Sequence, residues 1–130
     1  MKLLSIQPTK FTPKVEYDPG KKTLEFNGFS LPENVYEFYG PVIKWLKEYF
    51  KDIDKEDLKD HPIIVKFKLS YFNSGSLKCI IEIIFQLADW RKNGIPVEIY
   101  WHYDEADTQI KESGQDISEI VGKSFFFVKN

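Results

Sequence analysis

The chain has 130 residues, of which 42% are hydrophobic and 16% aromatic, and its formal net charge is −2. This length suits one domain with an apolar core, and the near-neutral charge does not favour nucleic-acid binding. No apolar run approaches the roughly 20 residues of a membrane-spanning helix, and residues 1–10 lack the pattern of a signal peptide. Because Cys79 is the only cysteine, an internal disulfide is excluded, and we expect one cytoplasmic domain over residues 1–130 without membrane insertion.

The first predicted elements form a β-hairpin. Residues 1–12 show no periodic pattern, and we expect them to be a loose N-terminal lead-in. Apolar and polar residues then alternate over 15–17 and again over 24–26, with Asp18-Pro19-Gly20 between them. Alternation with a period of two is typical of strands and this tripeptide is typical of a turn, so the pattern predicts two antiparallel strands.

A helix is predicted after the hairpin. Ser30 and Asn34 each precede a glutamate by three residues, which is the spacing of a helix capping box. We expect Gly40-Pro41 to kink this helix or to start its main part, because proline lacks the backbone N–H. One apolar face is formed by Val42, Ile43, Leu46, Tyr49 and Phe50. Residues 52–60 are predicted to be a charged connector.

Three more strands and two more helices are predicted beyond residue 60. The apolar sides of the first two strands carry Val65, Phe67, Leu69 and Tyr71, and then Val97, Ile99, Trp101 and Tyr103. Between them, the turn at 73–76 starts a helix that runs to about Lys92. The acidic segment 104–121 is predicted to be mostly helical, with Gly114 as a weak point, and 124–128 is a last strand.

The alternation in these strands indicates the architecture. Parallel strands covered on both faces are continuously apolar, whereas these strands have one polar side. We therefore expect helices on one face of the sheet and a polar face open to water, where Lys66 and Lys68 pair with Glu25 or Glu98. The prediction is an α+β domain with a single sheet of about five strands, helices packed on one face and the order β-β-α-β-α-β-α-β.

The helix after residue 74 carries a second apolar stripe beside its core face. Cys79, Ile83 and Trp90 lie together on this flank at 100° per residue. The stripe either packs against a neighbouring helix or is exposed, in which case it marks a partner-binding site.

Groupings of catalytic or metal-binding residues are scarce. His61 and His102 share no metal-ligand spacing with Cys79, which lies in the apolar helix as expected for a buried structural thiol. A cluster of carboxylates, Asp104, Glu105 and Asp107, either belongs to the first turn of a helix or acts in acid–base chemistry or cation binding. We therefore expect no catalytic residue, metal or cofactor, and the alternative is a small-molecule-binding domain or enzyme that uses this cluster with His102.

The turn Asn73-Ser74-Gly75-Ser76 places hydroxyl groups at the positive end of a helix dipole. Asn73, Ser74 or Ser76 can act as the N-cap of the helix. A hydroxyl at this position can also be phosphorylated, which adds about −1.5 to −2 charges. The phosphoryl oxygens can accept hydrogen bonds from the backbone N–H groups at the start of the helix, so the helix need not unfold.

Several segments, taken in order, resemble the SiaC family of bacterial regulatory phosphoproteins. The resemblance runs from about Thr12 to Val128. It rests on Thr12-Pro13 with Val15, on Ser30-Leu31-Pro32-Glu33-Asn34 before Phe38, Pro41 and Trp45-Leu46, on Tyr71-Phe72-Asn73-Ser74-Gly75-Ser76, and on Val97-Glu98-Ile99-Tyr100-Trp101-His102-Tyr103-Asp104-Glu105.

The resemblance implies a non-catalytic partner-switching protein with the STAS-like fold of anti-anti-sigma factors. It implies that a cognate Ser/Thr kinase modifies a hydroxyl in the turn, that a metal-dependent Ser/Thr phosphatase reverses this, and that the unphosphorylated form activates a diguanylate cyclase. Ser74 maps to the phosphoacceptor, with Ser76 as second choice, and Asn73 and Gly75 complete the turn. Ser74 stands where the family has a threonine, and Gly75 stands where it has a serine. We expect Gly75 to loosen the turn, because glycine restricts the backbone least.

Overall fold

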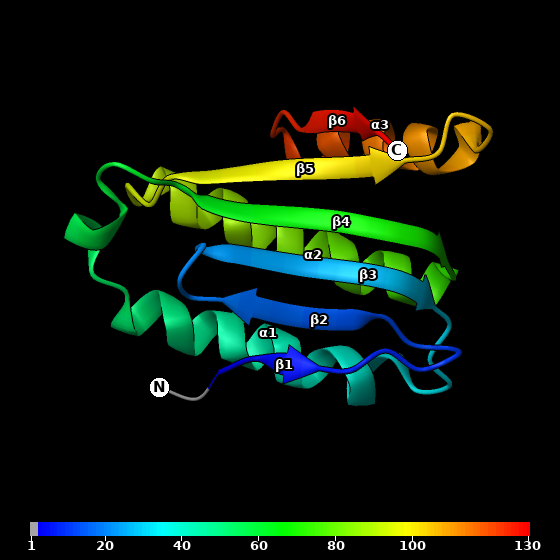
Figure 1. The fold of residues 1–130 in the computed structure, drawn as a ribbon, viewed down its shortest axis with the longest axis horizontal. Coiled ribbons are helices and arrows are strands. Elements are labelled where there is room, and N and C mark those ends of the chain that lie inside the picture. Colours follow the sequence, from blue (N-terminus) through cyan, green and yellow to red (C-terminus); the bar gives the residue numbers. More distant parts are fainter. Residues whose placement is uncertain (1–2) are drawn as a thin grey trace.

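A single mixed sheet forms the framework of the computed structural model, which describes residues 3–130. Its six strands are β1 (Ser5–Ile6), β2 (Lys14–Asp18), β3 (Thr23–Ser30), β4 (Ile63–Phe72), β5 (Val97–Tyr103) and β6 (Phe126–Lys129) (Figure 1). The helices are α1 (Val35–Asp52), α2 (Ser74–Lys92) and α3 (Thr108–Val121), with a short 3₁₀ helix η1 (Lys55–Leu58). No helix within residues 3–130 is long and apolar enough to cross a membrane.

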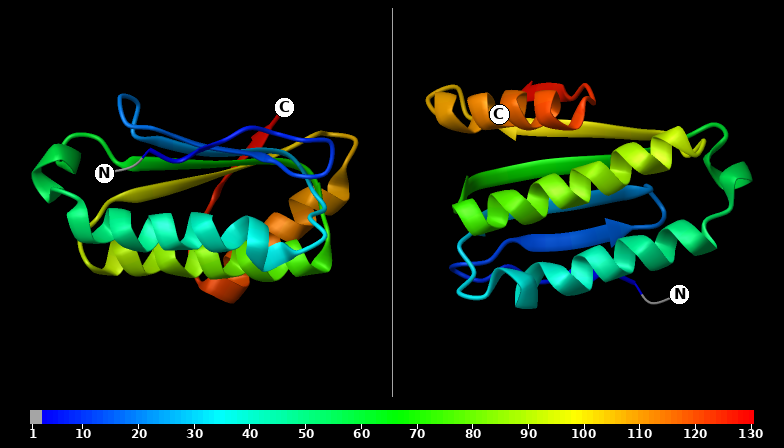
Figure 2. Two further views of the ribbon diagram at one scale, coloured as in Figure 1. Left: turned by 90° about the horizontal axis from the view of Figure 1, so that it is seen from below. Right: turned by 180° about the vertical axis from the view of Figure 1, so that it is seen from behind.

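The strands lie side by side in the order of the chain, β1 to β6. β1, β2 and β3 pair antiparallel, whereas β3, β4, β5 and β6 pair parallel, so α1, α2 and α3 are crossover connections. Each crossover leads to the adjacent strand, always in the same direction across the sheet. Because such connections are right-handed, all three helices lie on the same face of the sheet. Figure 2 shows this arrangement, which confirms the predicted one-sided helical layer.

The N-terminal lead-in contains more structure than its composition indicates. Ser5 and Ile6 pair with β2, the backbone N–H of Tyr17 donates to Leu4 O at 2.9 Å, and the Leu4 side chain is buried. The expectation of a loose segment over residues 1–12 is therefore wrong for this part, and the sheet gains a sixth strand. Two residues are too few for periodicity to reveal a strand.

Helix α1 begins at the second of the two predicted capping positions. The Asn34 side chain accepts from the backbone N–H of Glu37 at 3.1 Å, whereas Ser30 is the buried last residue of β3. The helix continues through Pro41, which therefore does not start it. Beyond α1, the charged connector contains η1, and the buried Leu58 attaches this segment to the core.

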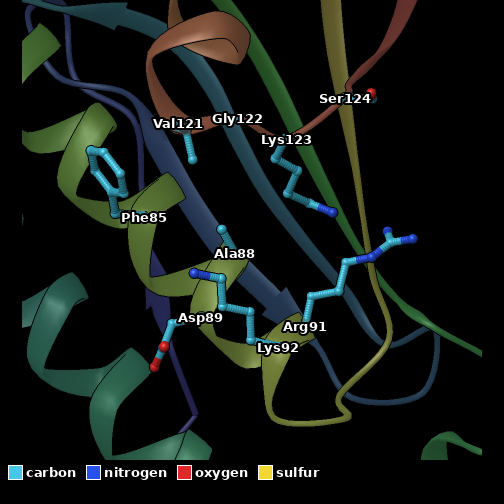
Figure 3. Close-up of a pocket in the computed structure, with 9 residues that line it drawn as sticks. All are labelled: Phe85, Ala88, Asp89, Arg91, Lys92, Val121, Gly122, Lys123 and Ser124. Atoms are coloured by element: carbon cyan, nitrogen blue, oxygen red, sulfur yellow. The ribbon is translucent and has the colours of Figure 1, made fainter.

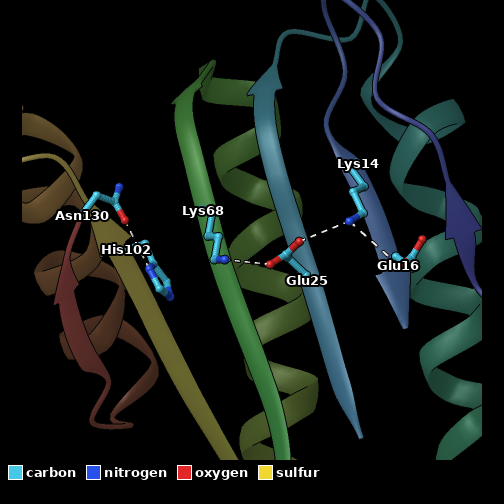
Figure 4. Close-up of polar contacts among 6 residues, drawn as sticks. All are labelled: Lys14, Glu16, Glu25, Lys68, His102 and Asn130. Carbon is cyan, nitrogen blue, oxygen red and sulfur yellow. Dashed lines mark hydrogen bonds and ion pairs between the residues drawn. The ribbon is translucent and has the colours of Figure 1, made fainter. Parts of the chain in front are cut away.

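The polar face of the sheet is held by ion pairs across three strands. Glu25 in β3 lies 2.9 Å from the ammonium of Lys68 in β4 and 3.4 Å from that of Lys14 in β2 (Figure 4). The predicted pairing of Glu25 with Lys68 is confirmed. Each of these side chains is at most one-third exposed, so the charges are partly shielded from water.

The alternation of β4 is interrupted near its C-terminal end. Gly28 pairs with Leu69, but the next residue of β3, Phe29, pairs with Tyr71, which leaves Ser70 as the extra residue of a β-bulge. A bulge reverses the side on which the following residues point. Tyr71 is accordingly 47% exposed although Leu69 is buried, so the prediction that both share the apolar side is wrong.

Candidate phosphorylation site at the start of helix α2

The turn between β4 and α2 is held by Asn73. Its side-chain oxygen accepts from the backbone N–H of Ser76 at 2.8 Å, which makes Asn73 the N-cap of α2. Its own backbone N–H donates to Ser30 O at 3.1 Å, at the end of the neighbouring strand β3. The open alternative among Asn73, Ser74 and Ser76 is thus resolved in favour of Asn73, and neither serine is needed as the cap.

Ser74 and Ser76 lie in different environments. Ser74 is the first residue of α2 and is exposed, and its hydroxyl has no hydrogen-bond partner within the described part of the chain. Ser76, two residues further along α2, is fully buried. Of these two hydroxyl groups, only that of Ser74 is therefore accessible to another protein while the domain is folded.

The buried Ser76 hydroxyl belongs to a chain of hydrogen bonds beneath the turn. Ser76 Oγ donates to Ser30 O at 3.2 Å, and Ser30 Oγ donates to Ser76 Oγ at 2.8 Å. Tyr39 Oη lies 2.5 Å from Ser30 Oγ. Because the Ser30 hydroxyl already donates its proton to Ser76, Tyr39 is the donor in this hydrogen bond. Burial raises the pKa of Tyr39 to about 12, so this phenol keeps its proton. The chain ties the start of α2 to both β3 and α1.

Gly75 lies where α1 and α2 approach each other closely. A Cβ at this position would lie 2.6 Å from Val35 Cγ2, closer than side chains approach one another. Gly75 lies within α2 and has ordinary helical geometry, without a positive φ. The absence of a side chain allows α1 and α2 to meet here, and the expectation that Gly75 loosens the turn stays a prediction.

The stripe of Cys79, Ile83 and Trp90 is not an exposed surface. All three side chains are buried, and the indole of Trp90 lies against the rings of Tyr49 and Phe50 in α1, with centroids 5.9 Å apart in each case. Burial raises the pKa of the Cys79 thiol, and the negative charge of Glu82 adds to this. The interpretation as an exposed partner site is thus wrong, and the interpretation as helix–helix packing holds.

Exposed apolar side chains gather instead at the end of the sheet that carries Ser74. We call this set the apical patch: Phe11, Phe29, Leu31, Tyr36 and Tyr71, which are 36–65% exposed. Phe29 and Tyr71 are paired across β3 and β4, and Tyr36 follows the residue that contacts Gly75. Prediction from the sequence missed this patch, because a bulge exposes Tyr71 and the loop before β2 positions Phe11.

The acidic cluster after β5 has structural partners. Asp107 caps α3 by accepting from the Ile110 N–H at 3.2 Å, and Asp104 accepts from the Asn130 side chain at 3.2 Å. Glu105 forms an exposed ion pair with Lys129. The carboxylates thus point to different partners, and Asp104 and Asp107 border a space of only about 30 Å³.

His102 lies next to this cluster on the polar face of the sheet. Its Nδ1 contacts the Asn130 side chain at 3.4 Å (Figure 4), and burial lowers the pKa of the imidazole. Its Nε2 is buried without a hydrogen-bond partner among the described residues. No set of three or more histidine, cysteine, aspartate or glutamate side chains within residues 3–130 is arranged to hold a metal ion.

The chain is similar to proteins of Pseudomonas aeruginosa in sequence and structure. It is 31% identical, over 116 residues, to an uncharacterised protein of strain UCBPP-PA14, a match that spans 89% of this chain and 87% of that protein. The crystal structure of apo-SiaC superposes with a TM-score of 0.83 at 31% identity and covers 100% of this chain and 99% of the other.

A further match is a chain in the crystal structure of the diguanylate cyclase SiaD in complex with its activator SiaC. It has a TM-score of 0.82 and 31% identity, with 97% of both chains covered. The SiaC family of regulatory phosphoproteins matches residues 6–130. With this coverage and identity over nearly the whole length, the chain belongs to the SiaC family of regulatory phosphoproteins.

Proposed function

We propose that this protein is a partner switch controlled by phosphorylation of Ser74. A cognate Ser/Thr kinase adds the phosphoryl group, a metal-dependent Ser/Thr phosphatase removes it, and the unphosphorylated form binds and activates a diguanylate cyclase. The observation that carries this proposal is the exposed hydroxyl of Ser74 at the start of α2, which has no hydrogen-bond partner within residues 3–130. The structural relative crystallised with the cyclase SiaD supports the choice of effector.

The surroundings of Ser74 suit a reversible modification. Modification requires an accessible hydroxyl, which Ser74 offers and the buried Ser76 does not. Asn73 already satisfies the Ser76 N–H, so a phosphoryl group on Ser74 leaves the existing cap intact. Its negative charge lies at the positive end of the α2 dipole, where anions are tolerated. The domain therefore stays folded while its surface changes.

The apical patch is the surface through which we propose that the cyclase is bound. Exposed aromatic side chains are typical anchors of protein interfaces. A phosphoryl group on Ser74 adds about −1.5 to −2 charges at the same end of the sheet, and that charge must lose water when a partner covers this end. Phosphorylation at this point therefore weakens the complex without altering the core.

Phosphorylation itself is tested with the kinase, ATP and peptide mapping by mass spectrometry. Ser74→Ala should remove the label. Ser70→Ala is the matched control, because Ser70 is also an exposed serine near the end of β4, and this variant should retain the label. Undiminished labelling of Ser74→Ala would refute the assignment of Ser74.

Switching is tested by measuring cyclase binding and cyclase activity with Ser74→Ala and Ser74→Asp. Ser74→Ala should bind as the unmodified protein does, and Ser74→Asp should bind at least tenfold more weakly. Equal binding by both variants would indicate a constitutive interaction domain, and stronger binding by Ser74→Asp would reverse the assigned direction.

The location of the interface is tested separately with Phe29→Ala. Phe126 is a matched control, because it is 51% exposed, against 50% for Phe29, but lies in the edge strand β6. Phe29→Ala should weaken cyclase binding and Phe126→Ala should not. The opposite result would place the interface at the edge strand β6 instead of the apical patch.

A further inference from the structure

A second site lies at the opposite end of α2, where this helix meets the connection from α3 to β6. A cavity of about 570 Å³ is bordered by both segments, and Figure 3 shows its lining. Its residues are Phe85, Ala88, Asp89, Arg91, Lys92, Val121, Gly122, Lys123 and Ser124. This volume falls in the range of small-molecule pockets, roughly 300–1,000 Å³.

Two cations converge at this cavity on a single backbone oxygen. Lys123 Nζ donates to Val97 O at 3.2 Å, and Arg91 Nη1 donates to the same oxygen at 3.3 Å. An ammonium has three donors and a guanidinium has five, so most of their donors have no partner among the described residues. No carboxylate of the described residues lies within 4 Å of either group, and the Asp89 side chain points away from both (Figure 3).

The burial of Lys123 is the unusual feature. The residue is only 8% exposed, although a buried ammonium without an acidic partner is costly. The helix dipoles favour cations near the C-termini of α2 and α3. An exposed cation gains this interaction as well, so the helix dipoles do not explain why Lys123 is buried. Burial and the nearby Arg91 charge both lower the pKa of Lys123, and the negative charge of Glu98 opposes this only in part. An anion with several oxygens would use the free donors and relieve the repulsion between the two cations.

Part of the remaining lining is apolar, next to the polar residues Asp89, Lys92 and Ser124. Phe85 is 48% exposed although it lies on the helix that covers the sheet, and Ala88 and Val121 continue this wall. Figure 3 places Phe85 on the opposite side of the lining from the two cationic groups, so a ligand that reaches both needs a flat ring at one end and a phosphate group at the other. We propose that this cavity binds a small phosphate-bearing molecule of the nucleotide class, with Arg91 and Lys123 holding the phosphate and Phe85 contacting the base.

The site is independent of the Ser74 switch and is tested with the unmodified full chain. The probes are inorganic phosphate, adenosine 5′-monophosphate and adenosine, added at equal ionic strength and followed by NMR of the backbone amides. The two phosphate-bearing probes should shift the signals of residues 121–124, and adenosine alone should not. Absence of any shift there, or binding of adenosine as tight as that of the nucleotide, would overturn the proposal.

Variants test the two cations. Lys123→Met preserves the length of the buried side chain, and Arg91→Gln provides a second variant with an exposed side chain in case the first does not fold. Each should weaken nucleotide binding at least tenfold. Lys44→Gln, an exposed lysine of α1, is the control and should bind normally. Unchanged affinity in Arg91→Gln and in folded Lys123→Met would refute the assignment.

Discussion

Gly75 and Val35 bring helices α1 and α2 together, because a Cβ on Gly75 would lie 2.6 Å from Val35 Cγ2. Overpacking of this kind typically costs about 1–3 kcal/mol. We expect Gly75→Ser to lower the free energy of unfolding by about that amount in urea titration. Val35→Ala should reduce the cost, so the double variant should lose less than the sum of the single variants. Additive losses of stability would show that the contact with Val35 does not limit the size of the side chain at position 75.

Gly114 has a comparable role in α3, where the sequence pattern indicates only a weak point of the helix. A Cβ here would lie 2.5 Å from the Trp101 indole, whose Nε1 donates to Ile110 O at 2.8 Å. Helix propensity alone predicts that Gly114→Ala stabilises the protein by about 1 kcal/mol. We expect a destabilisation of about 1–3 kcal/mol instead, with a change in tryptophan fluorescence.

The control for this prediction is Gln115→Ala, at an exposed position of the same helix. It should leave the free energy of unfolding within about 0.5 kcal/mol of the unmodified chain. A more stable Gly114→Ala variant would contradict the packing argument.

The two serines of the turn should differ sharply in their effect on stability. Ser76→Ala removes a fully buried hydroxyl that bonds to Ser30, and unsatisfied buried groups cost about 1–3 kcal/mol. Ser74→Ala removes an exposed hydroxyl without a partner in the described structure, so its effect should stay within about 0.5 kcal/mol. Chemical denaturation of both variants checks this, and equal losses would contradict the assignment of separate roles.

These contacts indicate how far the sequence predicts the fold and the site. Strand alternation predicted the one-sided helical layer and the pairing of Lys68 with Glu25, because both follow from a period of two. The bulge at Ser70 could not be predicted, because it depends on how β3 and β4 are aligned. The sequence also left open which serine of the turn is exposed, since that depends on Ser30 and Tyr39, which are distant in the chain.

The same limit applies to the apolar flank of α2. A stripe such as Cys79, Ile83 and Trp90 has one pattern whether it meets water or another helix, and only the position of α1 decides between them. The apical patch was missed for the converse reason. Single exposed aromatic residues are common on protein surfaces, and only the fold gathers Phe11, Phe29 and Tyr71 at one end.

Glu25 should make stability depend on pH in the acid range. Burial acts to raise the pKa of this carboxyl, but the hydrogen bonds and charges of Lys68 and Lys14 together outweigh it and lower the pKa. A carboxyl with a lowered pKa in the folded state stabilises the protein above its unfolded pKa, about 4.3, and loses this contribution as the pH falls through the folded pKa. Glu25→Gln should therefore reduce the melting temperature at pH 7 and make less difference at pH 3.

Glu16→Gln is the matched control, because the Glu16 carboxylate is more exposed and, within residues 3–130, pairs only with the Lys14 ammonium, at 4.0 Å. Its effect at pH 7 should be smaller than that of Glu25→Gln, because exposed pairs contribute little. Added salt should also narrow the difference between the unmodified chain and Glu25→Gln, since salt screens partly exposed charges. A difference in melting temperature that is the same at pH 7 and pH 3 would mean that Glu25 acts through packing and not through its charge.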